Sequence, residues 1–134
     1  MATDKDLLDA FEKLYQYFNR HDFTEQSWAT IEPLLADNVT VKKLDGPGYH
    51  EGKAALKAYF LYGNGKSDLP SCTIKNRDAQ IIGNIGVVSG SADFVDTNTT
   101  SPPSNPRPIA YSATFSGATG FWEMIYLWGS CWPS

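Results

Sequence analysis

Residues 108–130, PIAYSATFSGATGFWEMIYLWGS, decide the fold of this chain. Two apolar stretches, 108–116 and 120–130, flank the glycine-bounded segment Gly117–Gly120. Strand-like alternation on both sides of a short glycine-containing turn is typical of a β-hairpin. The sequence therefore predicts that the chain ends in two antiparallel strands.

The last of these strands is apolar on both alternating sets of positions. Ile125 and Leu127 form the set that we expect to face the interior. The other set is predicted to lie on the outer face of the sheet: Trp122, Met124, Tyr126 and Trp128. Contiguous apolar area of this size usually marks an interface, so the pattern favours a homodimer through the outer sheet face. The alternative is a monomer in which its own helices and the segment 96–108 cover both faces.

Upstream of the hairpin, the residues from Ser71 onward also have the period of strands. We expect strands at 71–82 and 86–95, separated by Gly83-Asn84, and a loop from Asp96 to Pro108, which contains four prolines. The C-terminal half thus predicts an antiparallel meander.

The N-terminal half has a helical period instead. One apolar stripe predicts a helix near 4–20, with Thr3 as its N-cap; its members are Leu7, Leu8, Phe11, Leu14, Tyr15 and Phe18. Thr24 can cap a second, shorter helix that Pro33 should bend or end. A third helix is expected from Lys53 to Tyr62, stopped by Gly63. Helices followed by a meander indicate an α+β fold in which helices cover one face of a curved sheet.

Length and composition agree with one globular domain over residues 1–134. The formal net charge is −4 and no basic cluster is present, which argues against nucleic-acid binding and against a membrane anchor. No window approaches a membrane-spanning length, and the acidic start does not resemble a signal peptide, so we expect a cytoplasmic protein. Cys72 and Cys131 lack metal-site spacing, and we predict two free thiols, no metal and no cofactor.

Three segments, taken in order and spacing, resemble the nuclear transport factor 2-like (NTF2-like) superfamily, which includes ketosteroid isomerase and the SnoaL-like polyketide cyclases. They are LADNVTV (35–41), YHEGKAALKAYF (49–60), and YSATF (111–115) leading to GFWEMI (120–125). The resemblance spans nearly the whole chain. It implies a cone-shaped α+β half-barrel, a pocket between helices and sheet, and a homodimer. It does not imply one activity, because enzymes and non-catalytic binding modules share this fold.

The residues for acid–base chemistry depart from the family pattern. By the spacing of the first segment, the family's catalytic aspartate falls on Lys43, which disfavours steroid isomerisation. Three other residues are candidate catalytic groups: His50, whose side chain titrates near neutral pH, Asp45, which is close to Lys43, and Asp93, which stands in an otherwise uncharged strand.

Aromatic side chains supply the candidate ligand-binding residues. Phenols lining a cleft can donate to a ligand carbonyl while their rings pack on an apolar body. The candidates are Tyr15, Trp28, Tyr49, His50, Tyr59, Tyr111 and Leu127. We expect a domain that binds a small, largely apolar molecule without chemistry. The alternative is a SnoaL-like cyclase, isomerase or dehydratase that acts on a polyketide- or steroid-like substrate.

Overall fold

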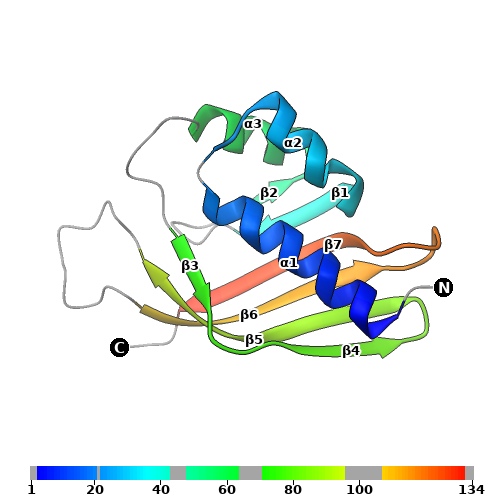
Figure 1. Cartoon of the computed structure of the whole chain (residues 1–134). Coiled ribbons are helices and arrows are strands. Elements are labelled where there is room, and N and C mark those ends of the chain that lie inside the picture. Colours follow the sequence, from blue (N-terminus) through cyan, green and yellow to red (C-terminus); the bar gives the residue numbers. More distant parts are fainter. Residues whose placement is uncertain (1–2, 21, 43–47, 64–70, 96–106, 132–134) are drawn as a thin grey trace.

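The computed structural model describes residues 3–20, 22–42, 48–63, 71–95 and 107–131. Within these ranges the chain forms three α-helices, one 3₁₀ turn and seven strands (Figure 1). The helices and the turn are α1 (Asp4–Arg20), α2 (Glu25–Ile31), η1 (Glu32–Leu34) and α3 (Lys53–Gly63). The strands are β1 (Leu35–Lys42), β2 (Tyr49–Glu51), β3 (Ser71–Ile74), β4 (Asp78–Ile82), β5 (Ile85–Val95), β6 (Arg107–Ser116) and β7 (Glu123–Cys131).

The strands form one mixed sheet that is mostly antiparallel and not closed. Its order is β2-β1-β7-β6-β5-β3, with β4 also paired to β5. The predicted meander is present in β5, β6 and β7, whereas β1 pairs in parallel with β7. Parallel pairing needs a long crossover, which here is the whole chain between β1 and β7. The α+β class predicted from the sequence is therefore confirmed.

The expected single strand 71–82 is wrong, because it is broken into β3 and β4 at residues 75–77. The backbone N–H groups of Lys75 and Asn76 both donate to the carbonyl oxygen of Ser91, at 2.9 and 3.3 Å. The side chain of Asn76 also bonds Ser91, accepting from its N–H at 3.1 Å and donating to its hydroxyl at 2.9 Å. These bonds hold residues 75–77 in a kink, in which the backbone carbonyl of Asn76 lies directly against Gly90 of β5.

Helices α1 and α3 span their predicted ranges to within one residue, and α2 begins directly after its predicted cap, Thr24. Thr3 caps α1, since its hydroxyl accepts from the N–H of Asp6 at 3.2 Å. Thr24 and Ser27 cap α2 reciprocally, each side-chain oxygen accepting from the other residue's N–H. Pro33 follows in η1, where the chain leaves α2 and enters β1. Side-chain caps therefore mark the first residues of α1 and α2.

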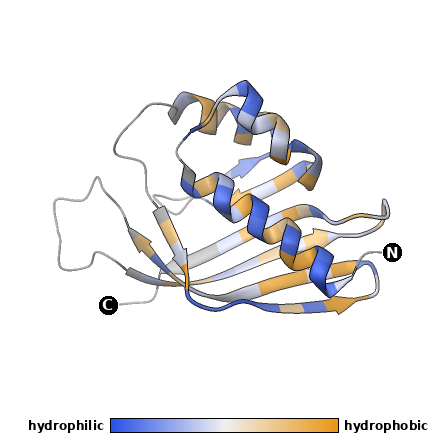
Figure 2. Ribbon diagram, in the orientation of Figure 1, coloured by the Kyte–Doolittle hydropathy of each residue, from blue (hydrophilic) through white to orange (hydrophobic). Residues whose placement is uncertain are grey.

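Helix α1 lies across the sheet and packs its apolar stripe on β5 and its neighbours, while α3 packs on β1 and β2 (Figure 1). We call the sheet face covered by α1 the inner face. Figure 2 shows hydrophobic positions of the sheet beneath the helices. The buried core draws on both layers and includes Leu7, Leu14, Trp28, Leu35, Val88, Ala113, Phe115 and Met124.

Side chains of α1 also close one edge of the sheet, along β3. The Asn19 amide donates to the carbonyl of Cys72 at 2.6 Å and accepts from its N–H at 3.0 Å. The Tyr15 hydroxyl accepts from the N–H of Ile74 at 3.3 Å. The outward-facing backbone groups of Cys72 and Ile74 are thereby bonded to the helix.

The last strand corrects the expected outer-face set. Met124 pairs with Phe115, whereas Tyr126 pairs with Thr114, so Ile125 is an extra residue in a bulge. A bulge of one residue reverses the alternation of side chains beyond it. Trp122 and Met124 therefore lie in the core at 4% and 1% exposure, and a place for them on an exposed outer face is wrong. Trp128, beyond the bulge, is 36% exposed.

The kink over Gly90 predicts a stability difference between two glycine substitutions in β5. A Cβ at position 90 would stand 2.2 Å from the Asn76 carbonyl oxygen, which is backbone and cannot yield. At Gly86 the nearest atom is a Leu7 methyl at 2.8 Å, which can rotate. We expect Gly90→Ala to lose about 3 kcal/mol of unfolding free energy and Gly86→Ala about 1 kcal/mol. Urea denaturation of both variants checks this, and equal losses would contradict the close approach.

Candidate functional site

The first group of candidate residues meets at the end of the inner face farthest from η1. His50 of β2 pairs with Val41 of β1, and Val41 pairs with Leu127 of β7. Leu127 and Val41 are partly buried against the core. Tyr59 of α3 lies over His50, with ring centroids 4.3 Å apart. The structure therefore brings three candidates, His50, Tyr59 and Leu127, to one end of the inner face.

An aromatic cluster continues from this end into the core. Tyr59 contacts Phe60 edge-on at 5.4 Å between centroids, and Phe60 in turn contacts Tyr17, Phe18 and Phe23. The ring centroid of Trp28 is 6.2 Å from that of Tyr17, and Trp28 is 1% exposed. Its indole N–H donates to Glu32 at 3.2 Å. Trp28 is thus part of the core, with its polar atom already bonded.

The remaining inner-face phenols stack on Phe11. The Tyr111 ring lies 5.5 Å from Phe11 and the Tyr15 ring 6.4 Å from it, both nearly parallel. The Tyr111 hydroxyl donates to the carbonyl of Asn76 at 2.8 Å. Arg77 lies over the Tyr15 ring and bonds the Glu12 carboxylate. The Tyr111 hydroxyl is therefore bonded to the β3–β4 kink, and the Tyr15 hydroxyl is bonded to β3.

Burial dominates the protonation behaviour of this region. It raises the pKa of Tyr111 to about 12, and nearby Arg77 opposes that shift. Burial, with a smaller contribution from Asp93, raises the pKa of the Cys72 thiol to about 11. A thiol with so high a pKa is protonated at neutral pH and is a poor nucleophile. Cys72 therefore behaves as a packing residue.

The acidic candidates do not join the inner-face group. Ala92 and Phe94 of β5 are buried under the helices, so Asp93 between them projects from the opposite, outer face. It pairs there with Lys75 at 3.3 Å. The strand register therefore directs the candidate Asp93 away from the inner face that carries His50 and Tyr59. Asp45 and Lys43 lie outside the described residues.

Tyr49 also lies on the outer face. It pairs across the sheet with Lys42, whose ammonium stands 5.9 Å from its ring. Its ring is 6.3 Å from that of Tyr126. A hydrogen bond with Tyr49 is the main cause that raises the pKa of Tyr126. Tyr49 thus groups with Tyr126 and Lys42 rather than with His50 and Tyr59.

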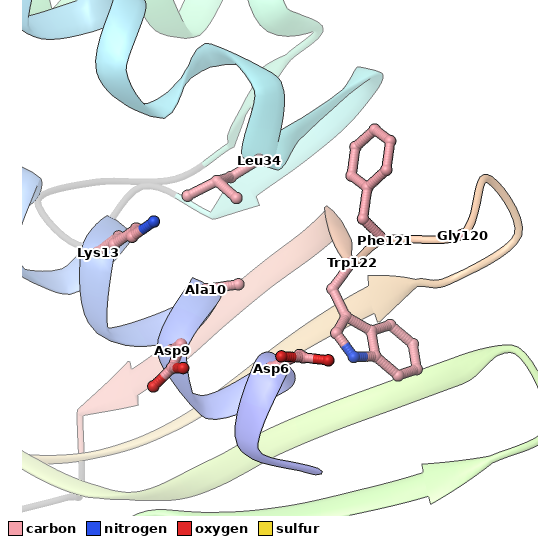
Figure 3. Close-up of a pocket in the computed structure, with 8 residues that line it drawn as sticks. All are labelled: Asp6, Asp9, Ala10, Lys13, Leu34, Gly120, Phe121 and Trp122. Carbon is pink, nitrogen blue, oxygen red and sulfur yellow. The ribbon is translucent and has the colours of Figure 1, made fainter. Parts of the chain in front are cut away.

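The sequence analysis did not predict a hollow of about 280 Å³ that lies beside the N-terminal half of α1 (Figure 3). It lies between α1, η1 and the β6–β7 turn, and is lined by Asp6, Asp9, Ala10, Lys13, Leu34, Gly120, Phe121 and Trp122. Phe121 is 50% exposed. A large apolar residue directly after the glycine turn was the available signal, but its neighbours come from distant parts of the sequence.

No cluster of three or more His, Cys, Asp or Glu side chains suited to a metal ion occurs in the described residues. No helix in the described ranges is long and apolar enough to cross a membrane.

Comparison with solved structures identifies the architecture. A proposed dehydratase of the NTF2-like family from Streptomyces avermitilis superposes with a TM-score of 0.72 at 12% identity, covering 98% of this chain and 96% of that one. This chain has the NTF2-like fold. A proposed ketosteroid isomerase from Shewanella frigidimarina shares the NTF2-like arrangement with a TM-score of 0.70 at 14% identity, covering 95% and 96%.

The same fold occurs in proteins named for different roles. The CaMKII hub of S. rosetta superposes with a TM-score of 0.70 at 16% identity, covering 96% of each chain. No protein-family model matches the sequence, and no curated protein matches it either. Identities this low show the NTF2-like fold alone and leave the activity open.

The Tyr111–Asn76 bond predicts a pH-dependent stability difference. Because the folded-state pKa of Tyr111 is raised, its contribution is present below pH about 10, the ordinary tyrosine value, and is lost as pH rises through about 12. We expect Tyr111→Phe to cost about 1 kcal/mol at pH 8, with the difference from wild type shrinking above pH 10. Both proteins share Tyr126, so the difference isolates Tyr111. Urea denaturation from pH 8 to pH 11.5 checks this, and a constant difference would contradict it.

Proposed function

We propose that the protein binds a small, largely apolar molecule on the inner face, between the helices and the sheet. The observation that carries the proposal is the convergence of His50, Tyr59 and Leu127 from β2, α3 and β7. Rings and aliphatic groups supply an apolar surface there, and the imidazole and phenol supply polar atoms that can orient a ligand. The proposal also includes the cone shape implied by the family resemblance, the single domain over residues 1–134 expected from length and composition, and a cytoplasmic location.

The position of the acids favours binding without chemistry. Proton abstraction next to a carbonyl needs a base within hydrogen-bond reach of the substrate. Asp93 is on the wrong face and ion-paired, and burial leaves Tyr111 and Cys72 protonated at neutral pH. Among the inner-face candidates that the structure describes, His50 is the one histidine, the residue type best suited to act as a base near neutral pH.

Substitutions on α3 test the binding site. Tyr59 lies over His50, whereas Tyr62 on the same helix is 77% exposed and serves as the matched control. We expect the uncharged fluorophore N-phenyl-1-naphthylamine to bind the folded protein, Tyr59→Ala to weaken that binding about tenfold, and Tyr62→Ala to leave it unchanged. Fluorescence titration measures all three.

Native mass spectrometry adds a direct readout, because a retained small molecule is shed on denaturation. Absence of probe binding to the folded wild-type protein, or equal effects of the two tyrosine substitutions, would contradict the proposed site.

The alternative function is a SnoaL-like cyclase, isomerase or dehydratase acting on a polyketide- or steroid-like substrate. The specific observation in its favour is the contact of His50 with Tyr59, which places a titratable base beside a phenol. Two proteins of the same fold are named as a proposed dehydratase and a proposed ketosteroid isomerase. Turnover of a Δ5-3-ketosteroid or a linear polyketide that His50→Gln abolishes, with probe affinity retained, would favour this function over binding alone.

The outer face supports a homodimer as part of the proposal. Tyr49 and Trp128 are 43% and 36% exposed, and Tyr126 lies beside Tyr49. Tyr126 and Trp128 pair with Thr114 and Ser112 of β6, so their cross-strand neighbours on this face have small side chains. Exposed aromatic rings on a sheet face are a suitable centre for a self-complementary contact. Trp122 and Met124 take no part, since they are buried within one chain.

A charge on this face tests the dimer. We expect Trp128→Glu to raise the dimer dissociation constant about a hundredfold, because a carboxylate would be buried without a partner in the contact. Tyr62→Glu on α3 is the matched control and should leave the mass unchanged. Light scattering over a concentration series reads the oligomeric state. A monomeric wild-type protein, or a dimer that tolerates Trp128→Glu, would refute the outer-face contact.

A further inference from the structure

The hollow beside the N-terminal half of α1 is separate from the proposed ligand site. Leu34, which lines the hollow, precedes Leu35 at one end of β1, and His50 pairs with Val41 near the other end. The partners of Leu35 and Val41 on β7 are Met124 and Leu127, which are three residues apart with the bulge at Ile125 between them, or roughly 10 Å. None of His50, Tyr59 and Leu127 lines the hollow, so the two proposed sites share no residue.

The hollow has apolar walls and a charged rim. Leu34 and Phe121 lie above it, Ala10 lies on α1, and the Trp122 ring closes its side (Figure 3). The Trp122 indole N–H already donates to the carbonyl of Thr3 at 3.2 Å, so it offers a ring surface and no free donor. The side chains suit an apolar group that enters between Leu34 and Phe121.

The two carboxylates on the rim retain acceptor capacity. Asp6 uses one oxygen, Oδ2, to accept from the Thr3 N–H at 3.1 Å. Asp9 also uses Oδ2, in a pair with Lys5 at 2.9 Å, and that lysine is 84% exposed. An exposed pair of this kind contributes little and is readily exchanged for another cation. Within the described residues, the Oδ1 atom of each aspartate has no hydrogen-bond partner and can accept from an incoming donor.

Lys13, the one lysine among the described residues that line the hollow, lies at the end of the rim away from Asp6. Lys13 is seven residues after Asp6 on the same helix, about 10 Å along its axis, and points toward Leu34 (Figure 3). The end of the hollow next to Trp122 therefore combines the Asp6 carboxylate with an aromatic ring, and Asp9 lies on the rim between Asp6 and Lys13 (Figure 3). Carboxylates and ring faces together favour an ammonium or guanidinium group over an anion.

The size of the hollow favours a side chain over a free ligand. Pockets for small molecules usually exceed about 300 Å³ and bury most of the ligand. This hollow is about 280 Å³, and one of its walls, Phe121, is itself half exposed. A partner that inserts one side chain gains the rest of its affinity from contacts around the rim.

We propose that this hollow is a docking site for a peptide segment of a partner protein, which inserts an apolar side chain between Leu34 and Phe121 and places a neighbouring lysine or arginine against Asp6 and Asp9. The site goes beyond the proposed ligand binding on the inner face and does not depend on it. Binding is weak and driven partly by charge, so it weakens as salt screens the carboxylates.

Two synthetic hexapeptides of matched length, GKLFKG and GELFEG with blocked ends, test the charge preference by ¹H–¹⁵N NMR titration. We expect the basic peptide to shift the signals of Ala10, Phe121 and the Trp122 indole N–H with a dissociation constant of about 1 mM, and the acidic peptide to leave them unchanged. Raising the salt from 0.02 to about 0.5 M should weaken the basic peptide severalfold.

Variants locate the contact. Phe121→Ser removes an exposed wall and should weaken the basic peptide about tenfold, whereas Tyr62→Ser on α3 should not. Asp9→Asn should weaken it about threefold, with the exposed Asp4, which does not line the hollow, as the matched control Asp4→Asn. Asp6 is not substituted, because its carboxylate accepts from the N–H of Thr3 and so completes the cap of α1.

Three results would overturn the proposal. Equal shifts with the acidic peptide would remove the charge preference, and shifts confined to the region of His50 and Tyr59 would place the peptide at the other site. Phenethylamine binding as tightly as the basic peptide would identify a small-molecule site instead of a protein-docking site. None of these results bears on N-phenyl-1-naphthylamine binding at the inner face, so the two proposals fail separately.

Discussion

The packing of Trp122 against two glycines and the start of α1 is the contact on which the rest of the structure depends. The indole lies where side chains at Gly86 and Gly117 would stand, and Leu7 of α1 shares the space above Gly86. The carbonyl of Thr3 accepts both the indole N–H and the N–H of Leu7. One residue thereby ties the β6–β7 turn, β5 and the first turn of α1 together. This contact fixes the N-terminal end of α1 on the sheet, while Asn19 and Tyr15 bond the other half of the helix to β3.

The bulge at Ile125 lets the same strand serve two surfaces. Before the bulge, Trp122 and Met124 complete the core under the helix. After it, Leu127 turns inward and Tyr126 and Trp128 turn outward, each paired with the corresponding face of β6. A strand of strict alternation would have placed all four large side chains on one side. The extra residue therefore divides a single apolar run between the fold and its exposed face.

Much of the fold could be predicted because its determinants are local. The stripe from Leu7 to Phe18 and the cap at Thr3 predict α1, and the glycine turn before Phe121 predicts the last hairpin. The errors arise where a residue is controlled by a distant one. The break at Asn76 depends on bonds to Ser91, the direction of Asp93 on the register of β5, and the bulge at Ile125 on pairing with β6. Residue types predicted candidate ligand groups, but only the register shows that Tyr49 and Asp93 lie apart from His50 and Tyr59.

The bonds from α1 to β3 have a further consequence for the behaviour of the protein in concentrated solution. A strand at the border of a sheet presents a row of backbone groups that another molecule can extend by adding a strand of its own. Here the Asn19 amide occupies the place of such a strand at Cys72, and the Tyr15 hydroxyl does so at Ile74. The helix therefore blocks the addition of a strand at this edge of the sheet. Asn19 and Tyr15, which bond the helix to the edge, thereby also limit aggregation.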